Sequence, residues 1–260
     1  MAISISLKDM IKNGVHFGHK ASRWNPKMKK YIFGKRSGLH IINLEKTADK
    51  LVAAMDFVHD TIADGKTVLI VATKSQTATI VAEYAEAAKI PFVTNRWLGG
   101  TLTNFKTIKG RVKYLKKLEA QVESGELEKY TKKEQSGFQK ELGILDKRLG
   151  GLRDMDNLPN VIFVTDINAD AIAIKEAKKL GIPIVGFADT NTDPTSIDYA
   201  IPANDDAINS LKYLLGVLNE VILDARSNPK VKKEKEGEKK EMKISDEVIA
   251  EKEAGATHKK

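Results

Sequence analysis

Charged side chains follow several short apolar runs of this sequence. If these runs are the strands of an open α/β sheet, the charged side chains lie at the carboxyl ends of the strands, where such sheets bind ligands. Lys74 and Ser75 follow one run at the start of a helical segment, where backbone N–H groups favour a phosphate. Five aspartates at or near the ends of later runs could hold Mg²⁺ through carboxylate oxygens: Asp166, Asp189, Asp193, Asp205 and Asp206. Because acids at such positions more often cap helices or form turns, this chemistry is weakly indicated.

Motifs for nucleotide binding and nucleophilic catalysis are missing from the sequence. It contains neither G-x-G-x-x-G nor G-x-x-x-x-G-K-[ST], and it has no G-x-S-x-G elbow. The chain has no cysteine, which excludes a cysteine nucleophile, disulfides and Cys-based zinc sites. His16, His19 and His40 lack the fixed spacing of a zinc motif. We therefore expect no catalytic residue, no metal site and no cofactor.

The N-terminal end of the chain carries a dense group of cations. Residues 1–36 contain nine Lys or Arg and one acid, Asp9, so their net charge of +8 equals that of the whole chain. Aromatic side chains lie among these cations: Phe17, Trp24, Tyr31 and Phe33. Cations bind phosphates and release counterions, and aromatic faces can stack on bases. This combination favours a nucleic-acid surface over a solvated basic edge.

The remaining charge is unevenly placed. Residues 101–156 carry 13 basic and 9 acidic side chains, and residues 227–260 carry 10 and 8. Residues 37–100 and 157–226 together have 11 basic and 17 acidic side chains, so they are net acidic. An acidic core with basic appendages, in a chain of pI near 9.3, indicates a protein that holds a polyanion from its periphery.

Hydropathy indicates a soluble protein with a substantial core. Hydrophobic residues make up 42% of the chain, and no run approaches the roughly 18 consecutive apolar residues of a membrane span. The apolar residues near Met1 are interrupted by polar and charged ones, which is unlike a secretory signal. We expect a cytoplasmic protein without a membrane partner.

Apolar periodicity divides most of the chain into alternating strands and helices. We expect strands at 67–72, 92–94, 160–165, 183–187 and 199–201, and helices at 44–64, 76–88, 169–180 and 205–226. Ser6 and Asn43 are candidate helix N-caps, and runs 31–33 and 39–42 are expected to pair as a hairpin. The alternation predicts an α/β fold with a mostly parallel sheet and helices on both faces.

One insertion interrupts the alternation. After a cap at Thr103 or Asn104, a helix ends near Gly125. A second helix carries apolar residues at heptad spacing: Phe138, Leu142, Leu145, Leu149 and Leu152. We expect a projecting coiled-coil hairpin of roughly 30 Å, rather than a helical pair folded onto the core. Trp97 is expected to pack at its base, with Arg96 directed outward.

These patterns together predict four parts. Residues 1–43 form a basic N-terminal extension with a short hairpin, and 44–102 with 157–226 form the α/β core. Residues 103–156 form the coiled-coil hairpin. Residues 227–260, rich in Lys and Glu and poor in apolar residues, are expected to be a disordered charged tail.

Several motifs, in collinear order from roughly residue 3 to residue 226, resemble bacterial small-subunit ribosomal protein number two. They are Gly14-Val-His-Phe-Gly-His19, Trp24-Asn-Pro-Lys-Met-Lys29, Tyr31-Ile-Phe-Gly34, His40-Ile-Ile-Asn-Leu-Glu-Lys-Thr47, Arg96-Trp-Leu-Gly-Gly-Thr-Leu-Thr-Asn104, Asp189-Thr-Asn191, Ile201-Pro202 and Asn204-Asp-Asp-Ala-Ile208. The resemblance implies a flavodoxin-like α/β fold with a protruding coiled coil and no catalytic activity. It also implies binding to small-subunit rRNA where head and body meet, and help in docking the large mRNA-binding ribosomal protein number one.

The resemblance and the charge pattern together nominate a set of rRNA contacts. These are Lys20, Arg23, Trp24, Lys27, Lys29, Lys30, Lys35, Arg36, Lys74, Arg96, Asn104 and Lys106. Expected partners are small-subunit rRNA and other small-subunit ribosomal proteins, including protein number one. Two alternatives stay open: a free-standing RNA-binding regulator, and an α/β enzyme acting on a phosphorylated ligand at Lys74, Ser75 and the aspartates.

Overall fold

The fold is built on a parallel sheet of five strands. The structure, a computed structural model, describes residues 5–229, and those up to Asn228 form one compact unit. The strands are β4 (Val68–Val71), β5 (Phe92–Val93), β6 (Val161–Val164), β7 (Ile184–Ala188) and β8 (Tyr199–Pro202). Their order across the sheet is β5-β4-β6-β7-β8, and all neighbours are parallel. This is the flavodoxin-like order 2-1-3-4-5, which confirms the predicted fold class.

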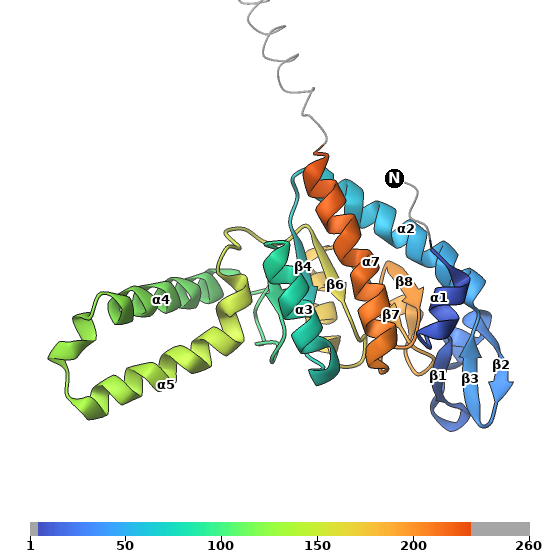
Figure 1. The fold of residues 1–260 in the computed structure, drawn as a ribbon, viewed down its shortest axis with the longest axis horizontal. Coiled ribbons are helices and arrows are strands. Elements are labelled where there is room, and N and C mark those ends of the chain that lie inside the picture. The colour runs from blue at the N-terminus through green and yellow to red at the C-terminus, as the bar shows by residue number, and fades with distance from the viewer. Residues whose placement is uncertain (1–4, 230–260) are drawn as a thin grey trace, which may run out of the picture. The chain divides into compact units, whose positions relative to one another are not determined.

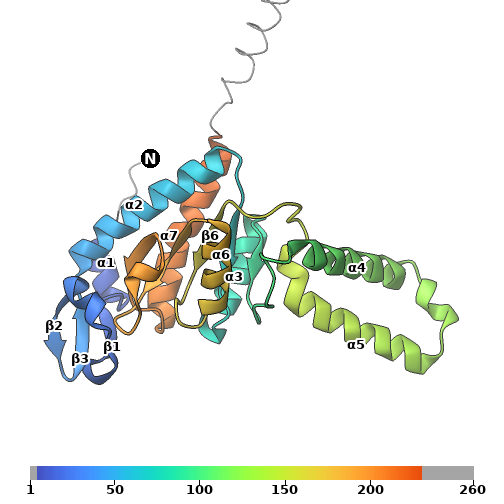
Figure 2. The same ribbon diagram turned by 180° about the vertical axis from the view of Figure 1, so that it is seen from behind.

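Helices cover both faces of this sheet (Figures 1 and 2). One face packs against α2 (Leu44–Ala63), α3 (Ser75–Ala87) and α7 (Ile208–Ser227), with the short α1 (Leu7–Lys12) alongside them. The other face packs against α6 (Ala171–Leu180) and the root of the helical insertion. Alternate residues of each strand enter opposite cores, which explains why the strands read as continuous apolar runs.

Local capping sets several helix boundaries. Ser6 accepts a hydrogen bond from Asp9 N, and Asn43 accepts from two amides of the first turn of α2, as predicted. α7 begins at Ile208 rather than at 205, because Asn204 Oδ1 accepts from the next two free amides in a turn. α6 likewise begins later than expected, because Asp166 Oδ1 forms a turn with Asn168 N and Ala169 N.

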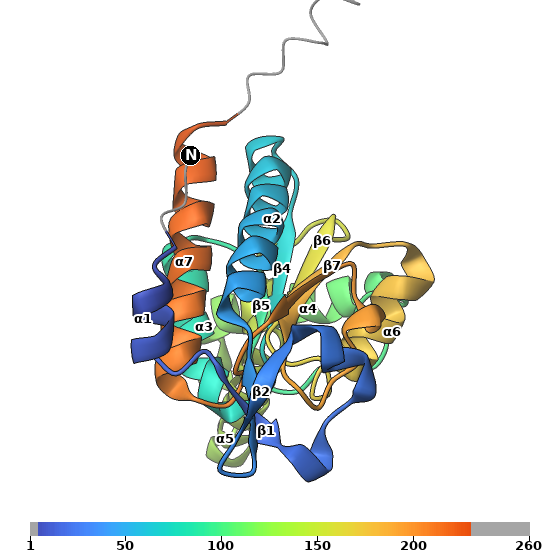
Figure 3. The same cartoon turned by 90° about the vertical axis from the view of Figure 1, so that its right-hand side faces the viewer.

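The N-terminal segment forms a separate antiparallel sheet with the order β1-β3-β2 (Figure 3, below α2). Its strands are β1 (Phe17–Lys20), β2 (Ile32–Arg36) and β3 (Leu39–Ile42). The predicted hairpin is confirmed, since Arg36 pairs with Leu39 across a two-residue turn whose residues both have positive φ. The sequence pattern does not predict β1, which is a strand because it pairs with β3. Two 3₁₀ helices, Ala21–Arg23 and Pro26–Tyr31, connect β1 to β2.

Two helices form the insertion, and they extend side by side beyond β5 (Figures 1 and 2). α4 (Phe105–Glu123) and α5 (Lys132–Leu149) are joined through a 3₁₀ helix, Glu126–Lys129, and a capping box between Thr131 and Glu134 starts α5. In α4, Ile108, Val112, Leu115 and Leu118 are buried, whereas in α5 Leu149 is buried and Leu142 and Leu145 are half-buried. Leu152 lies in the following 3₁₀ helix, Gly150–Leu152, and not in α5. Coiled-coil packing of this pair stays a prediction.

The expected division into extension, core, hairpin and tail stays a prediction as well, because residues up to Asn228 form one unit. The predicted disordered tail lies, from residue 230 onward, outside the described residues. Within residues 5–229, no helix is long and apolar enough to span a membrane.

Candidate nucleic-acid interface

The N-terminal basic segment, residues 14–36, is attached to the α/β core by its apolar side chains and its backbone. Met28 and Tyr31 are buried in the core beneath one sheet face. Asn25 N donates to Thr190 O at 2.8 Å, and His19 N donates to Thr190 Oγ1 at 2.8 Å. These contacts fix the segment to the loop after β7 and leave its cations at the surface.

Most of the cations nominated in this segment are exposed and unpaired. Among the described residues, no ion-pair partner is found for Lys20, Arg23, Lys29, Lys30, Lys35 and Arg36. Lys30 Nζ lies 4.8 Å from the ring centroid of Tyr31. An exposed cation without an acidic partner binds a phosphate without first breaking an ion pair, so these side chains are suited to the expected role.

Lys27 and Trp24 are less free than the sequence suggested. Lys27 Nζ lies 2.6 Å from Asp193 Oδ2, and this contact lowers the pKa of Asp193 to about 2. Lys27 must therefore leave Asp193 to reach a phosphate. Trp24 is half-buried, with its ring centroid 5.2 Å from that of His40, so part of its surface already packs against the protein.

The loop from Arg96 to Asn104 lies between β5 and α4. Arg96 is exposed and has no ion-pair partner in the described part of the chain. Trp97 is 6% exposed, which confirms that it packs into the protein rather than offering its face to a base. Its Nε1 donates to Glu176 Oε1 at 3.1 Å. Sequence reasoning missed Glu176, since nothing in its helix distinguishes it from a surface acid.

The two nominated contacts at the start of α4 are also exposed. Asn104 occupies the N-cap position, but its side chain caps no backbone amide, and its Oδ1 accepts from Thr107 Oγ1 at 2.9 Å. Lys106 lies in the first turn and makes no ion pair among residues 5–229. Together with Arg96, they place polar and cationic groups at the root of the hairpin.

Lys74 is held differently, at the carboxyl end of the sheet. Its Nζ lies 3.0 Å from Asp166 Oδ2, 3.1 Å from Asp205 Oδ1 and 2.6 Å from Asp206 Oδ1. Burial by itself would lower the pKa of Lys74, but the three carboxylates outweigh it and raise that pKa. Burial and neighbouring carboxylates raise the pKa of Asp205 to about 7. Of the nominated contacts, Lys74 is therefore the least able to reach rRNA, and its ion cluster fills the position where a phosphorylated ligand would bind.

His19 joins the aspartates at this end of the sheet. Its Nδ1 lies 3.0 Å from Asp189 Oδ2, and its Nε2 lies 3.3 Å from Asp206 Oδ2. The hydrogen bond to Asp189 is the main cause that raises the pKa of His19. One donor atom from each of the three residues lies within 4.8 Å of the others, so they could hold a divalent cation. The sequence pointed to both aspartates as possible Mg²⁺ ligands and considered His19 only for zinc; it did not predict that the three come together, because His19 lies in β1, far from both aspartates along the chain.

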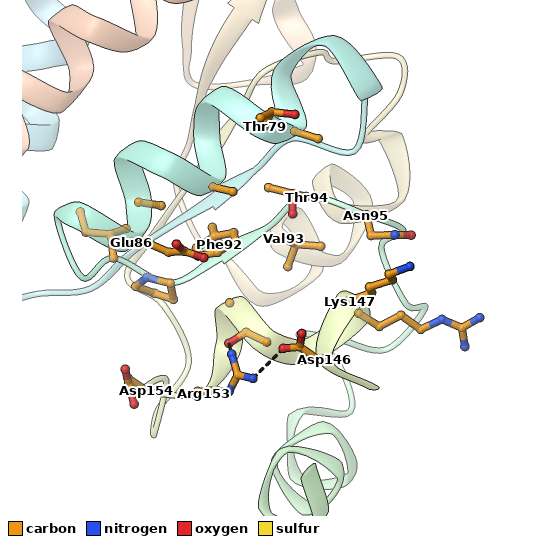
Figure 4. Close-up of a pocket in the computed structure, with 18 of the residues that line it drawn as sticks. Thr79, Glu86, Phe92, Val93, Thr94, Asn95, Asp146, Lys147, Arg153 and Asp154 are labelled. Carbon is orange, nitrogen blue, oxygen red and sulfur yellow. Dashed lines mark hydrogen bonds and ion pairs between the residues drawn. The ribbon is translucent and has the colours of Figure 1, made fainter. Parts of the chain in front are cut away.

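A groove of about 750 Å³ lies between α3, β5 and the end of α5 (Figure 4). On one side Arg153 is held by Asp146 at 2.6 Å and by Glu119. Gly151 covers the edge of β5 so closely that an added Cβ would lie 2.3 Å from Phe92 O. The groove is lined by charges of both signs, including Lys147 and Glu86, and has no cluster suited to one ligand or to catalysis.

Taken together, these features define a structural α/β protein with a basic exterior. The ligand position of the sheet is closed by the protein's own ion cluster, and the unpaired cations among the nominated contacts lie on the N-terminal basic segment and near the hairpin root. This arrangement supports scaffolding rather than catalysis.

Comparisons with known proteins identify the family. Residues 10–225 match the family described as Ribosomal protein S2, and the chain belongs to this family. It is 46% identical over 247 residues to "Small ribosomal subunit protein uS2" of Coprothermobacter proteolyticus, covering 95% of this chain and 92% of the relative. It is 44% identical over 252 residues to the protein of the same name in Geotalea uraniireducens, covering 97% and 98%. The predicted resemblance is confirmed, and this family of ribosomal proteins is structural, not enzymatic.

Proposed function

We propose that this chain is a structural protein of the small ribosomal subunit and binds small-subunit rRNA at the junction of head and body. Family membership and two relatives named as small-subunit proteins support the ribosomal role. The observation that carries rRNA binding is the set of unpaired cations on the N-terminal basic segment, which is attached to the sheet through Met28, Tyr31 and Thr190. Attachment before binding reduces the ordering cost of contacting a polyanion.

The N-terminal sheet also carries apolar side chains that suit a protein partner. Phe33 is 78% exposed, and it borders a pocket of about 610 Å³ that also includes Phe17, Leu39 and Ile41, with Lys35 and Arg36 among its other lining residues. Exposed aromatic side chains of this kind are typical anchors of protein interfaces. We assign this surface to docking of neighbouring ribosomal proteins, among them the large mRNA-binding protein number one.

The experiment that tests rRNA binding compares two pairs of lysines. Changing Lys29 and Lys35 together to Gln should flatten the slope of log affinity against log salt by just under two units, because each lost phosphate contact removes just under one. The matched control changes Lys89, in the turn after α3, and Lys212, on α7, to Gln; both are exposed, and the change removes the same charge. Equal slopes for the two double variants would show that binding follows net charge, and the N-terminal surface would be rejected.

The free-standing regulator shares this RNA surface and differs in where the protein is found. Stoichiometric co-migration with small subunits in a sucrose gradient supports the ribosomal role. A pool that remains entirely free of subunits would favour the regulator. The enzyme alternative is set aside, because Lys74 is bound by three carboxylates and the family is not enzymatic.

A further inference from the structure

One carboxylate on α6 collects five hydrogen bonds from the loop between β5 and α4. Glu176 Oε1 accepts from Trp97 Nε1 at 3.1 Å and from Gly100 N at 2.8 Å. Glu176 Oε2 accepts from Leu102 N at 3.0 Å, and from the amide and hydroxyl of Thr103 at 3.1 and 3.2 Å. A single side chain thus binds the 97–103 loop at its first residue, near its middle and at its last residue.

Glu176 is 8% exposed and has no cationic partner among residues 5–229. Burial by itself would raise its pKa, but the hydrogen bonds from Gly100, Thr103, Trp97 and Leu102 outweigh burial and lower it. The charge is therefore stabilised by loop N–H groups instead of a salt bridge. Removing such an acceptor leaves several donors unpaired at once, so the loop conformation depends strongly on this one residue.

Apart from Glu176, the loop is held by turns, in which Thr101 N and Oγ1 donate to Leu98 O and Asn104 N donates to Gly100 O, and by the burial of Trp97 and Leu102. Gly100 has φ +89°. Glycine has no strong preference for this backbone conformation in the unfolded chain, so local preference alone does not hold the turn. The amides of Leu102 and Thr103, which lie just before α4, are bound by Glu176. Arg96 precedes Trp97 directly, and fixing the indole fixes the backbone from which the exposed guanidinium extends.

We propose that Glu176 is a positioning residue for RNA binding, which holds the 97–103 loop so that Arg96 is presented to an RNA phosphate. This inference rests on the proposed function, since it assumes that Arg96 contacts rRNA. Glu176 does not touch RNA itself; a carboxylate would repel a phosphate. Glu176 affects RNA affinity by setting the conformation of the 97–103 loop. A residue that only stabilises the fold would not change RNA affinity in this way.

The test is a cycle of Glu176→Gln, Arg96→Gln and the double variant, measured on a small-subunit rRNA fragment. Each single change should weaken binding roughly tenfold and flatten the salt slope by just under one unit, as expected for one lost charged contact. The double variant should bind no worse than Arg96→Gln, because both changes remove the same contact. Hydrogen exchange at the amides of Gly100, Leu102 and Thr103 should be faster in Glu176→Gln, with or without Arg96.

Two further variants complete the test: a charge control and a milder change to the same set of hydrogen bonds. Glu220→Gln removes an exposed carboxylate of α7 and should change neither affinity nor exchange in the loop. Trp97→Phe keeps a ring but removes one of the five donors, so it should give a smaller loss in the same direction even if Glu176→Gln fails to fold.

Two outcomes would overturn the proposal, and they differ in what they leave standing. If Arg96→Gln weakens binding but Glu176→Gln and Trp97→Phe leave affinity and slope unchanged, Glu176 is a structural residue only and the rRNA surface stands. If Arg96→Gln itself has no effect, the loop is not an rRNA contact, and the lysine pairs decide the proposed function separately.

Discussion

At the carboxyl end of the sheet, Lys74 is 19% exposed and contacts three carboxylates. On the N-terminal basic segment, Lys29 and Lys35 are exposed and contact no acid in the described part of the chain. The sequence nominated all three for rRNA, yet the structure gives them different surroundings. Whether a cation is available to an external anion depends on its partners within the fold, and not on its residue type.

The largest expected effect comes from removing the cation of the ion cluster around Lys74. Lys74→Met keeps the apolar stem but leaves Asp166, Asp205 and Asp206 without their cation, and this should cost about 3–5 kcal/mol of unfolding free energy. Urea denaturation measures the loss, and Lys29→Met serves as the control, with a change within about 0.5 kcal/mol. If the two variants are equally stable, the distinction between paired and unpaired cations does not hold.

Asp170, which is buried near Asp166, should make the stability of the fold depend on pH. Burial raises the pKa of Asp170 from 3.8 to about 6. The folded state therefore holds a proton that the unfolded state releases, and the stability this provides is fully present below pH 4 and lost as pH rises through 6. The loss amounts to about 3 kcal/mol. Asp170→Asn should remove this part of the pH profile, and an unchanged profile would show that the pKa of Asp170 does not differ between the folded and unfolded states.

The smallest effect concerns Lys27, which lies between the two extremes. Its ammonium holds the pKa of Asp193 at about 2, below the usual 3.8. Lys27→Gln should return that pKa toward 3.8, as measured by carboxyl NMR titration. The stability linked to this pair is present above pH 4 and lost as pH falls toward 2, and it should be small because both side chains are partly exposed. A pKa that stays near 2 would mean that the contacts from Thr195 dominate.

Local pattern was enough to predict most elements of this chain, but not β1, which forms by pairing with β3. The apolar runs, the caps at Ser6 and Asn43 and the turn before Leu39 depend on near neighbours, and they appear where the sequence placed them. Helix starts that were off by two or three residues followed from side-chain turns at Asp166 and Asn204, which sequence periodicity does not record.

The sequence by itself determined the α/β alternation, the helical insertion and the concentration of positive charge before residue 37, because each is a property of neighbouring residues. The tertiary structure alone decided which charges are neutralised. Strand order places β4 beside β6, and the segment that follows β8 leads into α7, which packs against α3; Lys74 is thereby paired with Asp166 and with Asp205 and Asp206. In the same way, the position of α6 under the 97–103 loop brings Glu176 to the N–H groups of that loop. Side-chain partners depend on distances in space, which no local periodicity encodes.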